Sequence, residues 1–315
     1  MLEWKEFDRI RVWMLRNARP IDLARWKYHF EEGSIHEVMT CLSAYQNSDG
    51  GFGHALEADS WNPSSTPVQT AAAVGILKES GFQDRRDGLV SAILGYLDSE
   101  SGFREGRWEN VAQSNDSYPH APWWSYQSGS KERERFNPTA TLTGFILLFA
   151  ERNSGLFKKG ILLADELIKE FLDNKKIDMH PLICIQDLLE DISKARVENL
   201  VRYEDAAKAF TERAAELILS DRDNWGGYCS YPSHFVKSKG DEVDRRLGDL
   251  SIKEAEWLVS RRNEDGVWDI SWNWEGYPKE FAISENWWKG NLAVRNCMFL
   301  RAMGKIEGLR VRERI

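Results

Sequence analysis

The 315-residue sequence lacks several features that mark common classes of protein. Its longest apolar run, 144–150, is far too short to cross a bilayer. The start, MLEWKEFDRIRVWML, contains acidic residues and no uninterrupted apolar stretch, so it does not resemble a secretory signal peptide. We therefore expect a protein of the cytoplasm without a transmembrane segment.

Cysteine is also scarce, and acidic residues outnumber basic ones. The four cysteines lie far apart with no CxxC pair, which favours free thiols in a reducing compartment over disulfides. Neither they nor the six histidines show zinc-ligand spacing, so we expect no metal and no cofactor. The net charge is −8 without a basic stripe, which argues against nucleic acid as a partner.

What the sequence does contain is helical periodicity. Ser34-Ile-His-Glu37 has the pattern of a capping box, and Thr66-Pro67 is a second typical helix start. Apolar residues recur at spacings of three and four in most segments, while strand patterns are absent. We therefore expect an all-α protein of about ten to twelve helices, forming a single domain over 1–315.

Two kinds of helical segment alternate along the chain. The amphipathic segments are 35–45, 86–98, 158–172, 204–220 and 252–262, and the segments that are apolar nearly all round are 67–80, 138–150, 180–190 and 289–303. The alternation predicts two concentric layers, with the amphipathic helices outside. The stretch 231–250 should hold an inner helix but is too polar, so we expect irregular structure there.

A short motif recurs where helices end. Its copies are Gln46–Phe52 (QNSDGGF), Arg262–Trp268 (RNEDGVW), Arg222–Tyr228 (RDNWGGY) and the shortened Asp98–Phe103. Its glycines permit a tight exit from a helix, and its Gln or Arg can hydrogen-bond backbone groups at a helix end. With an aromatic residue covering the joint, the motif is mainly a structural clasp.

These copies resemble the QW repeat of squalene and oxidosqualene cyclases and of protein prenyltransferase β subunits. QNSDGGFG also resembles the QNxDGGWG-type stretch of squalene–hopene cyclases, in which a pair of acids similar to Glu57 and Asp59 follows. The resemblance implies an α/α-toroid, the fold that the alternation of helices also predicts. It does not extend to catalysis, because the DxDD, DDxxD and Asp-x-Cys plus His motifs of these enzymes are absent.

The chemistry is expected in the four long connections 47–66, 99–137, 221–235 and 263–288. They hold 10 of the 14 tryptophans and a net charge of −10, and in a toroid they would gather at one end. Long loops in compact domains are usually functional. An acidic, aromatic mouth suits uncharged sugars or cationic ligands better than a bare diphosphate.

Two sets of candidate residues lie in or beside these connections. The candidate acids or bases are Glu57, Asp59, Asp116 and Asp269, and the candidate substrate-binding residues are His54, Trp61, His120, Trp123, Trp124, Tyr231, His234, Trp268, Trp272 and Trp274. Trp272 and Trp274 beside Asp269 most resemble a sugar subsite. For every cluster, a purely structural role in a solvated or self-packed loop is the alternative.

We therefore expect an enzyme or binder, of toroid ancestry, for an uncharged or cationic small molecule such as an isoprenoid or a carbohydrate. One alternative is a glycan hydrolase or lyase on an α/α-barrel, with Asp59 and Asp269 as the acid and base. The other is a non-catalytic module that binds a protein or a metabolite. An enzyme requires two acids that converge in a cavity, one of them in an apolar setting that raises its pKa.

Overall fold

The computed structural model describes residues 1–126 and 135–309, and within them the protein is all-α, as predicted. These residues form thirteen α-helices, three short 3-10 helices and one two-stranded antiparallel hairpin. The hairpin is an exception to the predicted absence of strands. None of the helices in this part of the chain combines the length and apolarity that a bilayer span requires.

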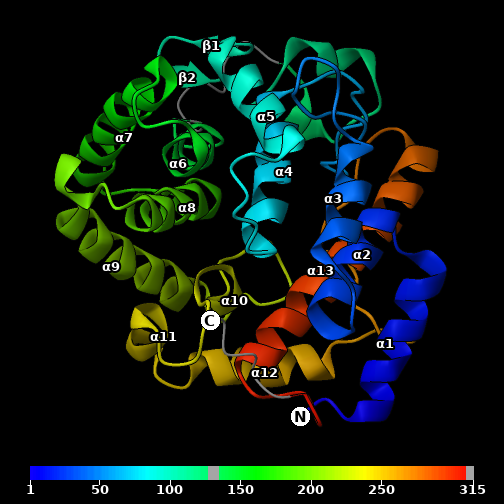
Figure 1. Ribbon diagram of the computed structural model, residues 1–315. Helices are drawn as coiled ribbons and strands as arrows, with labels where there is room; N and C mark the ends of the chain where they lie inside the picture. Colours follow the sequence, from blue (N-terminus) through cyan, green and yellow to red (C-terminus); the bar gives the residue numbers. More distant parts are fainter. Residues whose placement is uncertain (127–134, 310–315) are drawn as a thin grey trace. The chain divides into compact units, whose positions relative to one another are not determined.

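The chain groups into two compact units, which are described separately (Figure 1). Unit 1 comprises Met1–Cys41, Ala214–Trp274 and the described part of Pro278–Ile315. Its helices are α1 (Trp4–Asn17), α2 (Pro20–Phe30), α10 (Pro232–Phe235), α11 (Glu242–Leu247), α12 (Leu250–Ser260) and α13 (Pro278–Ala302). The short α10 and α11 lie in the stretch that was expected to be irregular, and α13 begins well before the predicted 289.

Unit 2 comprises Leu42–Arg213 and Glu275–Tyr277. Its elements are α4 (Pro67–Glu79), α5 (Gly88–Asp98), β1 (Phe103–Arg104), β2 (Arg107–Trp108), η1 (Gln113–Ser117), η2 (Pro122–Trp124), α6 (Thr139–Phe149), α7 (Gly155–Asp173), α8 (Met179–Ala195) and η3 (Glu198–Leu200). The unit boundaries fall within α3 (Ile35–Ser43) and α9 (Tyr203–Asp221). A helix occupies most of every segment that was predicted to be helical.

The core of unit 2 is built around α6, which packs against α4, α5, α7 and α8 (Figure 1). Every residue of α6 except Leu148 is buried, as its uniformly apolar sequence predicts. Two glycines allow close packing. A Cβ at Gly144 would lie 2.7 Å from Asp191 Oδ2 of α8, and one at Gly160 of α7 would lie 2.8 Å from Ile146 Cγ2. Larger side chains at these glycines would push the helices apart.

The predicted helix ends are confirmed. The Ser34 hydroxyl accepts from the Glu37 N–H at 3.2 Å, and the Glu37 carboxylate accepts from the Ser34 N–H at 3.3 Å. The Thr66 hydroxyl accepts from the Gln69 N–H at the start of α4. Beyond the other end of α4, Gly81 takes a φ of +68°, which a glycine adopts without steric cost.

In unit 1, α13 packs against α1, α2 and α12. Gly290 brings α13 close to the start of α2, since a Cβ there would lie 3.4 Å from the Cβ of Ala18, which precedes α2, and 3.7 Å from the Asp22 Cβ of α2. The buried Asp22 carboxylate is paired with Arg19 at 2.7 Å and with Arg25 at 2.8 Å. Breaking such a buried pair by removing one partner is costly, so this cluster fixes α2.

Two copies of the repeated motif share one backbone pattern. The Asn47 N–H donates to the Gly51 carbonyl at 2.9 Å, and the Asn263 N–H donates to the Val267 carbonyl at 2.7 Å. In both copies the asparagine carbonyl accepts from the glycine three positions later. Both motifs therefore make the same tight turn after an α-helix.

The side chains of the motif act as predicted. The Gln46 Nε2 donates to the Gly50 carbonyl at 3.0 Å and to the Leu89 carbonyl in the first turn of α5 at 3.3 Å. Gly50 has a φ of +88°, and a Cβ there would lie 2.1 Å from the Ala92 carbonyl oxygen. The Phe52 ring is fully buried. In these contacts the motif is a structural clasp.

Candidate functional site

His54, the first candidate after the first clasp, is held by that clasp. Its exposed ring places Nε2 2.9 Å from Asn47 Oδ1. His54 and Ala55 both adopt the left-handed conformation, with φ of +58° and +60°. This conformation costs about 1–2 kcal/mol per non-glycine residue, so neighbouring contacts must maintain it.

Backbone pairing brings the first and second candidate clusters together in unit 2. Ser60 and His120 form an antiparallel bridge. On either side, the Trp61 N–H donates to the Pro119 carbonyl and the Ala121 N–H donates to the Asp59 carbonyl, both at 2.9 Å. Asp59 is only 2% exposed, whereas Glu57 and Trp61 are half-buried.

The second cluster contains groups that stabilise their own loop. The exposed Asp116 carboxylate accepts from the Tyr126 N–H at 2.8 Å and lies 3.8 Å from His120 Nε2. Trp123 is exposed and Trp124 half-buried. Residues 127–134 of the same predicted loop lie outside the described residues. Local contacts are thus the observed role of Asp116, and its predicted action on a substrate stays a prediction.

In unit 1, two tryptophans that were predicted to bind substrate are packed in the interior. Trp268 is 4% exposed, and its Nε1 donates to the Leu258 carbonyl of α12 at 2.9 Å. Trp274 is 7% exposed beside Phe281, with ring centroids 5.8 Å apart. Their burial gives both residues a packing role, and their predicted contact with a ligand stays a prediction.

Asp269 is bound on two sides. Its Oδ1 accepts from Asn263 Nδ2 at 2.9 Å and lies 3.0 Å from Lys289 Nζ of α13. The Asn263 hydrogen bond, together with Lys289, holds the pKa of Asp269 below its usual range. Asp269 is therefore ionised at neutral pH, which makes it a poor proton donor. Like His54, it is anchored by the asparagine of the preceding clasp.

Tyr231 and His234 lie in an aromatic group of unit 1 that includes two further rings. The Tyr231 ring centroid lies 6.0 Å from that of Trp225 and 5.7 Å from that of Trp257. The rings of Tyr231 and His234 meet edge to face at 5.4 Å. All four residues are half-buried, so the group lies at the edge of the core of unit 1 and not in its centre.

Beside this group lies Glu254, an acid that the sequence reading missed. It is 1% exposed, its Oε2 accepts from the Ser233 N–H at 2.8 Å, and its Oε1 lies 2.5 Å from the Ser233 Oγ. Burial raises the pKa of Glu254 to about 8. The available signal was its position, because Leu250, Glu254 and Leu258 share one face of α12, where an acid is unexpected.

Unit 2 holds a second unpredicted cluster, centred on Lys78 of α4. Its Nζ lies 3.0 Å from Asp187 Oδ1 and 3.0 Å from Asp191 Oδ2, both on α8. The Thr141 hydroxyl of α6 donates to Asp187 Oδ2 at 2.9 Å. Burial raises the pKa of Asp191 to about 6, although Lys78 acts in the opposite direction. The cluster ties α4 to α8 through ion pairs.

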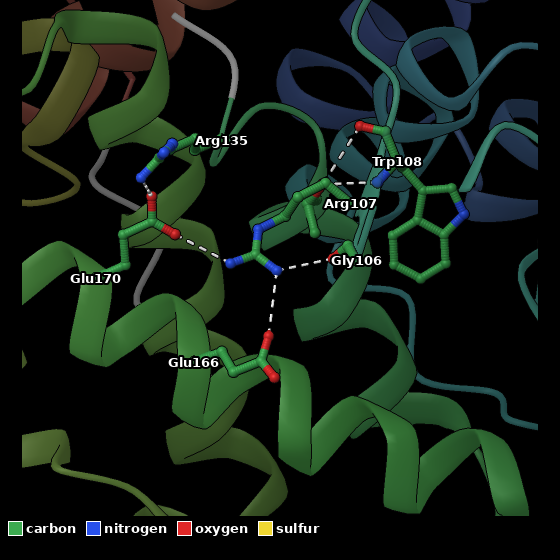
Figure 2. A network of polar contacts seen from close by, with 7 residues as sticks. Gly106, Arg107, Trp108, Arg135, Glu166 and Glu170 are labelled. Carbon is green, nitrogen blue, oxygen red and sulfur yellow. Dashed lines mark hydrogen bonds and ion pairs between the residues drawn. The ribbon is translucent and has the colours of Figure 1, made fainter. Parts of the chain in front are cut away.

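A third polar network lies on the surface of unit 2 (Figure 2). Arg107 of β2 reaches Glu166 at 3.3 Å and Glu170 at 3.0 Å on α7, and Arg135 reaches Glu170 at 2.7 Å. These four side chains line an open groove of about 590 Å³. Because each arginine is already paired with a carboxylate, the network is best explained as a fastening of the hairpin to α7.

The site with the most suitable chemistry is therefore the one around Glu254 and Ser233, with Tyr231 and His234 from the predicted set. In the described part of the chain, no group of three histidine, cysteine or acidic residues is arranged to hold a metal. Comparison with protein-family models and with curated proteins returns no match to this chain.

Proposed function

We propose that the chain is an enzyme that transfers a proton to or from an uncharged or cationic small molecule. In this proposal Glu254 is the acid or base, the Ser233 hydroxyl relays the proton, and the nearby aromatic rings hold the substrate. The single observation that supports it most is a buried carboxyl with a pKa of about 8 whose Oε1 lies 2.5 Å from a half-buried hydroxyl.

The physical basis is a match between the pKa and the working pH. General acid–base catalysis is most efficient when the catalytic pKa lies near the operating pH. At pH 7 most Glu254 side chains carry a proton, which Oε1 can donate to the Ser233 oxygen. Ser233 is half-buried, whereas Glu254 is 1% exposed, so the hydroxyl is the group that can reach a substrate.

The rings of Trp225, Tyr231 and Trp257 define the class of substrate. Aromatic faces attract cations by about 0.5–2 kcal/mol and stack on flat apolar surfaces. Glu254 and Trp257 are three residues apart on α12, and therefore on the same side of the helix. A neutral molecule that becomes cationic on protonation would be stabilised at such rings.

Ancestry and compartment complete the proposal. The clasps and their resemblance to QW repeats support descent from terpenoid-cyclase and prenyltransferase toroids, with different catalytic residues. All four cysteines are free, which supports action in the reducing cytoplasm.

The net charge of −8 supports a small-molecule partner over a nucleic acid. In the glycan-hydrolase alternative Asp269 is the base and not the acid, because its carboxyl is held ionised.

The test uses two panels, neutral oligosaccharides and isoprenoid alcohols, screened by thermal shift and by product analysis. Glu254→Gln keeps the shape of the side chain but cannot exchange a proton. We expect it to bind a hit within about twofold of the wild type and to form product about 10²–10⁴-fold more slowly. Glu256→Gln, on the exposed side of α12, is the matched control and should behave as the wild type. Full turnover by Glu254→Gln would overturn the proposal, and binding without turnover in the wild type would favour a non-catalytic module.

A further inference from the structure

One face of α13 carries a stripe of polar side chains within unit 1. Ser284, Trp288, Asn291 and Arg295 follow one another at spacings of four, three and four, so they lie on the same side of the helix. Over this range the helix rises about 16 Å. The stripe is unusual because α13 otherwise contributes apolar residues such as Val294 to the core.

Two atoms in the middle of the stripe are buried without a hydrogen-bond partner among the described residues. They are the Trp288 Nε1–H, a donor, and Asn291 Oδ1, an acceptor. An unsatisfied buried polar group costs about 1–3 kcal/mol. Native structures hold only a few such groups per hundred residues, and a bound molecule is one way in which such groups are satisfied.

A second aromatic ring lies beside Trp288, which carries one of the two unsatisfied atoms. The Trp272 ring meets the Trp288 ring edge to face, with centroids 5.3 Å apart and planes at 82°. The loop that carries Trp272 is fastened to α13, because Lys289 pairs with Asp269 at 3.0 Å and with Glu285 at 2.9 Å. The loop that carries Trp272 is therefore positioned against α13 by ion pairs that share Lys289.

We propose that this stripe is a binding subsite for a neutral, hydroxyl-bearing ligand. A single hydroxyl group complements both atoms, since its oxygen can accept from the Trp288 Nε1–H while its proton is donated to Asn291 Oδ1. The ring planes of Trp272 and Trp288 then contact the apolar part of the molecule. A charged group is not required, and neither atom carries a charge.

The stripe also leads toward Glu254. The positive charge of Arg295 lowers the pKa of Glu254. The end of the stripe therefore lies within electrostatic range of the Ser233–Glu254 pair. The subsite deepens the proposed function, because it identifies the substrate as a neutral alcohol or sugar. The reaction of this substrate rests on the proposed function, whereas its binding does not.

The experiment measures binding of two probes, cellobiose and farnesol, to the full chain by tryptophan fluorescence and by thermal shift. Asn291→Leu removes the acceptor with little change in volume. We expect it to weaken the probe that binds by about tenfold. Asn296→Leu, on another face of α13, is the matched control and should leave the affinity unchanged.

A second readout separates ligand binding from structure. Asn291→Leu should leave the melting temperature of the free protein unchanged or raise it, because it removes an unsatisfied acceptor. Trp288→Phe, which keeps a ring but loses the donor, gives an independent test if Asn291→Leu does not fold. The inference is overturned if neither probe binds, or if both variants bind like the wild type. If Glu254→Gln loses turnover but binds the probe like the wild type, both the proposed function and the subsite stand. If the wild type turns the probe over and Asn291→Leu does not change its affinity, the subsite is wrong and the proposed function stands.

Discussion

Each unit contains a buried carboxyl group whose pKa is raised, and these two groups are held in opposite ways. In unit 2, Asp191 is 0% exposed and faces the ammonium group of Lys78 at 3.0 Å. In unit 1, Glu254 is 1% exposed and faces the hydroxyl and the N–H of Ser233. Burial raises the pKa of both, to about 6 for Asp191 and about 8 for Glu254.

The difference shows what a buried cation does. Removal from water disfavours the charged form of either acid, and an adjacent ammonium group offsets much of that effect. At pH 7 Asp191 is therefore mostly charged and acts as one side of an ion pair. The hydrogen bonds from Ser233 lower the pKa of Glu254 less than burial raises it, so Glu254 stays mostly protonated. A carboxyl of the first kind fastens helices, and one of the second kind can carry a proton.

The largest expected effect is a pH-dependent loss of folding stability caused by the buried Glu254. Its pKa is about 8 in the folded protein against 4.5 unperturbed, so the unfolded state loses the proton first as the pH rises. Stability should fall between pH 4.5 and 8 by up to about 5 kcal/mol and level off above pH 8. Urea unfolding at intervals from pH 4.5 to 9 measures this as the difference between the wild type and Glu254→Gln.

The direction of this difference in unfolding free energy follows from the raised pKa of Glu254. Glu254→Gln should gain stability relative to the wild type as the pH rises, whereas the exposed Glu256→Gln should show no such trend. A difference that stays constant with pH would mean that Glu254 is ionised in the folded protein, and the contrast with Asp191 would disappear.

The second effect is the loss of the cation in unit 2. Lys78→Met leaves the buried Asp191 and the half-buried Asp187 without their ammonium partner, which should cost about 3–5 kcal/mol at pH 7. The cost should shrink toward pH 5, because Asp191 then takes up a proton. Urea unfolding at both pH values measures it. A loss that does not depend on pH would indicate a packing defect and not an uncompensated charge.

The smallest effect belongs to the surface network of Figure 2, which is the exposed counterpart of the Lys78 cluster. Glu170→Gln weakens the contacts to Arg107 and Arg135, yet solvent reaches all three side chains. We expect a loss below about 1 kcal/mol, and one that diminishes further in 1 M salt. Unfolding curves at low and high salt test this. A loss comparable to that of Lys78→Met would show that burial is not what separates the two clusters.

Much of the helical structure was predictable because local rules specify it. The Ser34–Glu37 capping box, the Thr66-Pro67 start and the left-handed Gly81 all have the expected geometry, and the apolar segment 138–150 forms a helix that is buried nearly all round. The length of α13 was not predictable, because its first turns mix polar and aromatic residues without periodicity. The arrangement of the helices as a toroid stays a prediction.

The site was predicted less well, for a physical reason. Sequence proximity to a clasp suggested His54 and Asp269 as chemical groups, but both bind the asparagine of that clasp. Glu254 and Lys78 owe their properties to burial, which depends on partners far away in the sequence. Lys78 meets acids more than a hundred residues later, a contact that no local pattern encodes.

The way the chain divides has a consequence for how the protein is made. Unit 2 is almost one continuous segment, Leu42–Arg213, and every element of its core is available once that segment has left the ribosome. Unit 1 joins Met1–Cys41 to segments that follow Ala214, with Leu2 paired to Ile306. The first two helices, α1 and α2, must therefore wait for their packing partner α13 until that helix has been synthesised. During that interval the nascent chain is most exposed to aggregation and to chaperones.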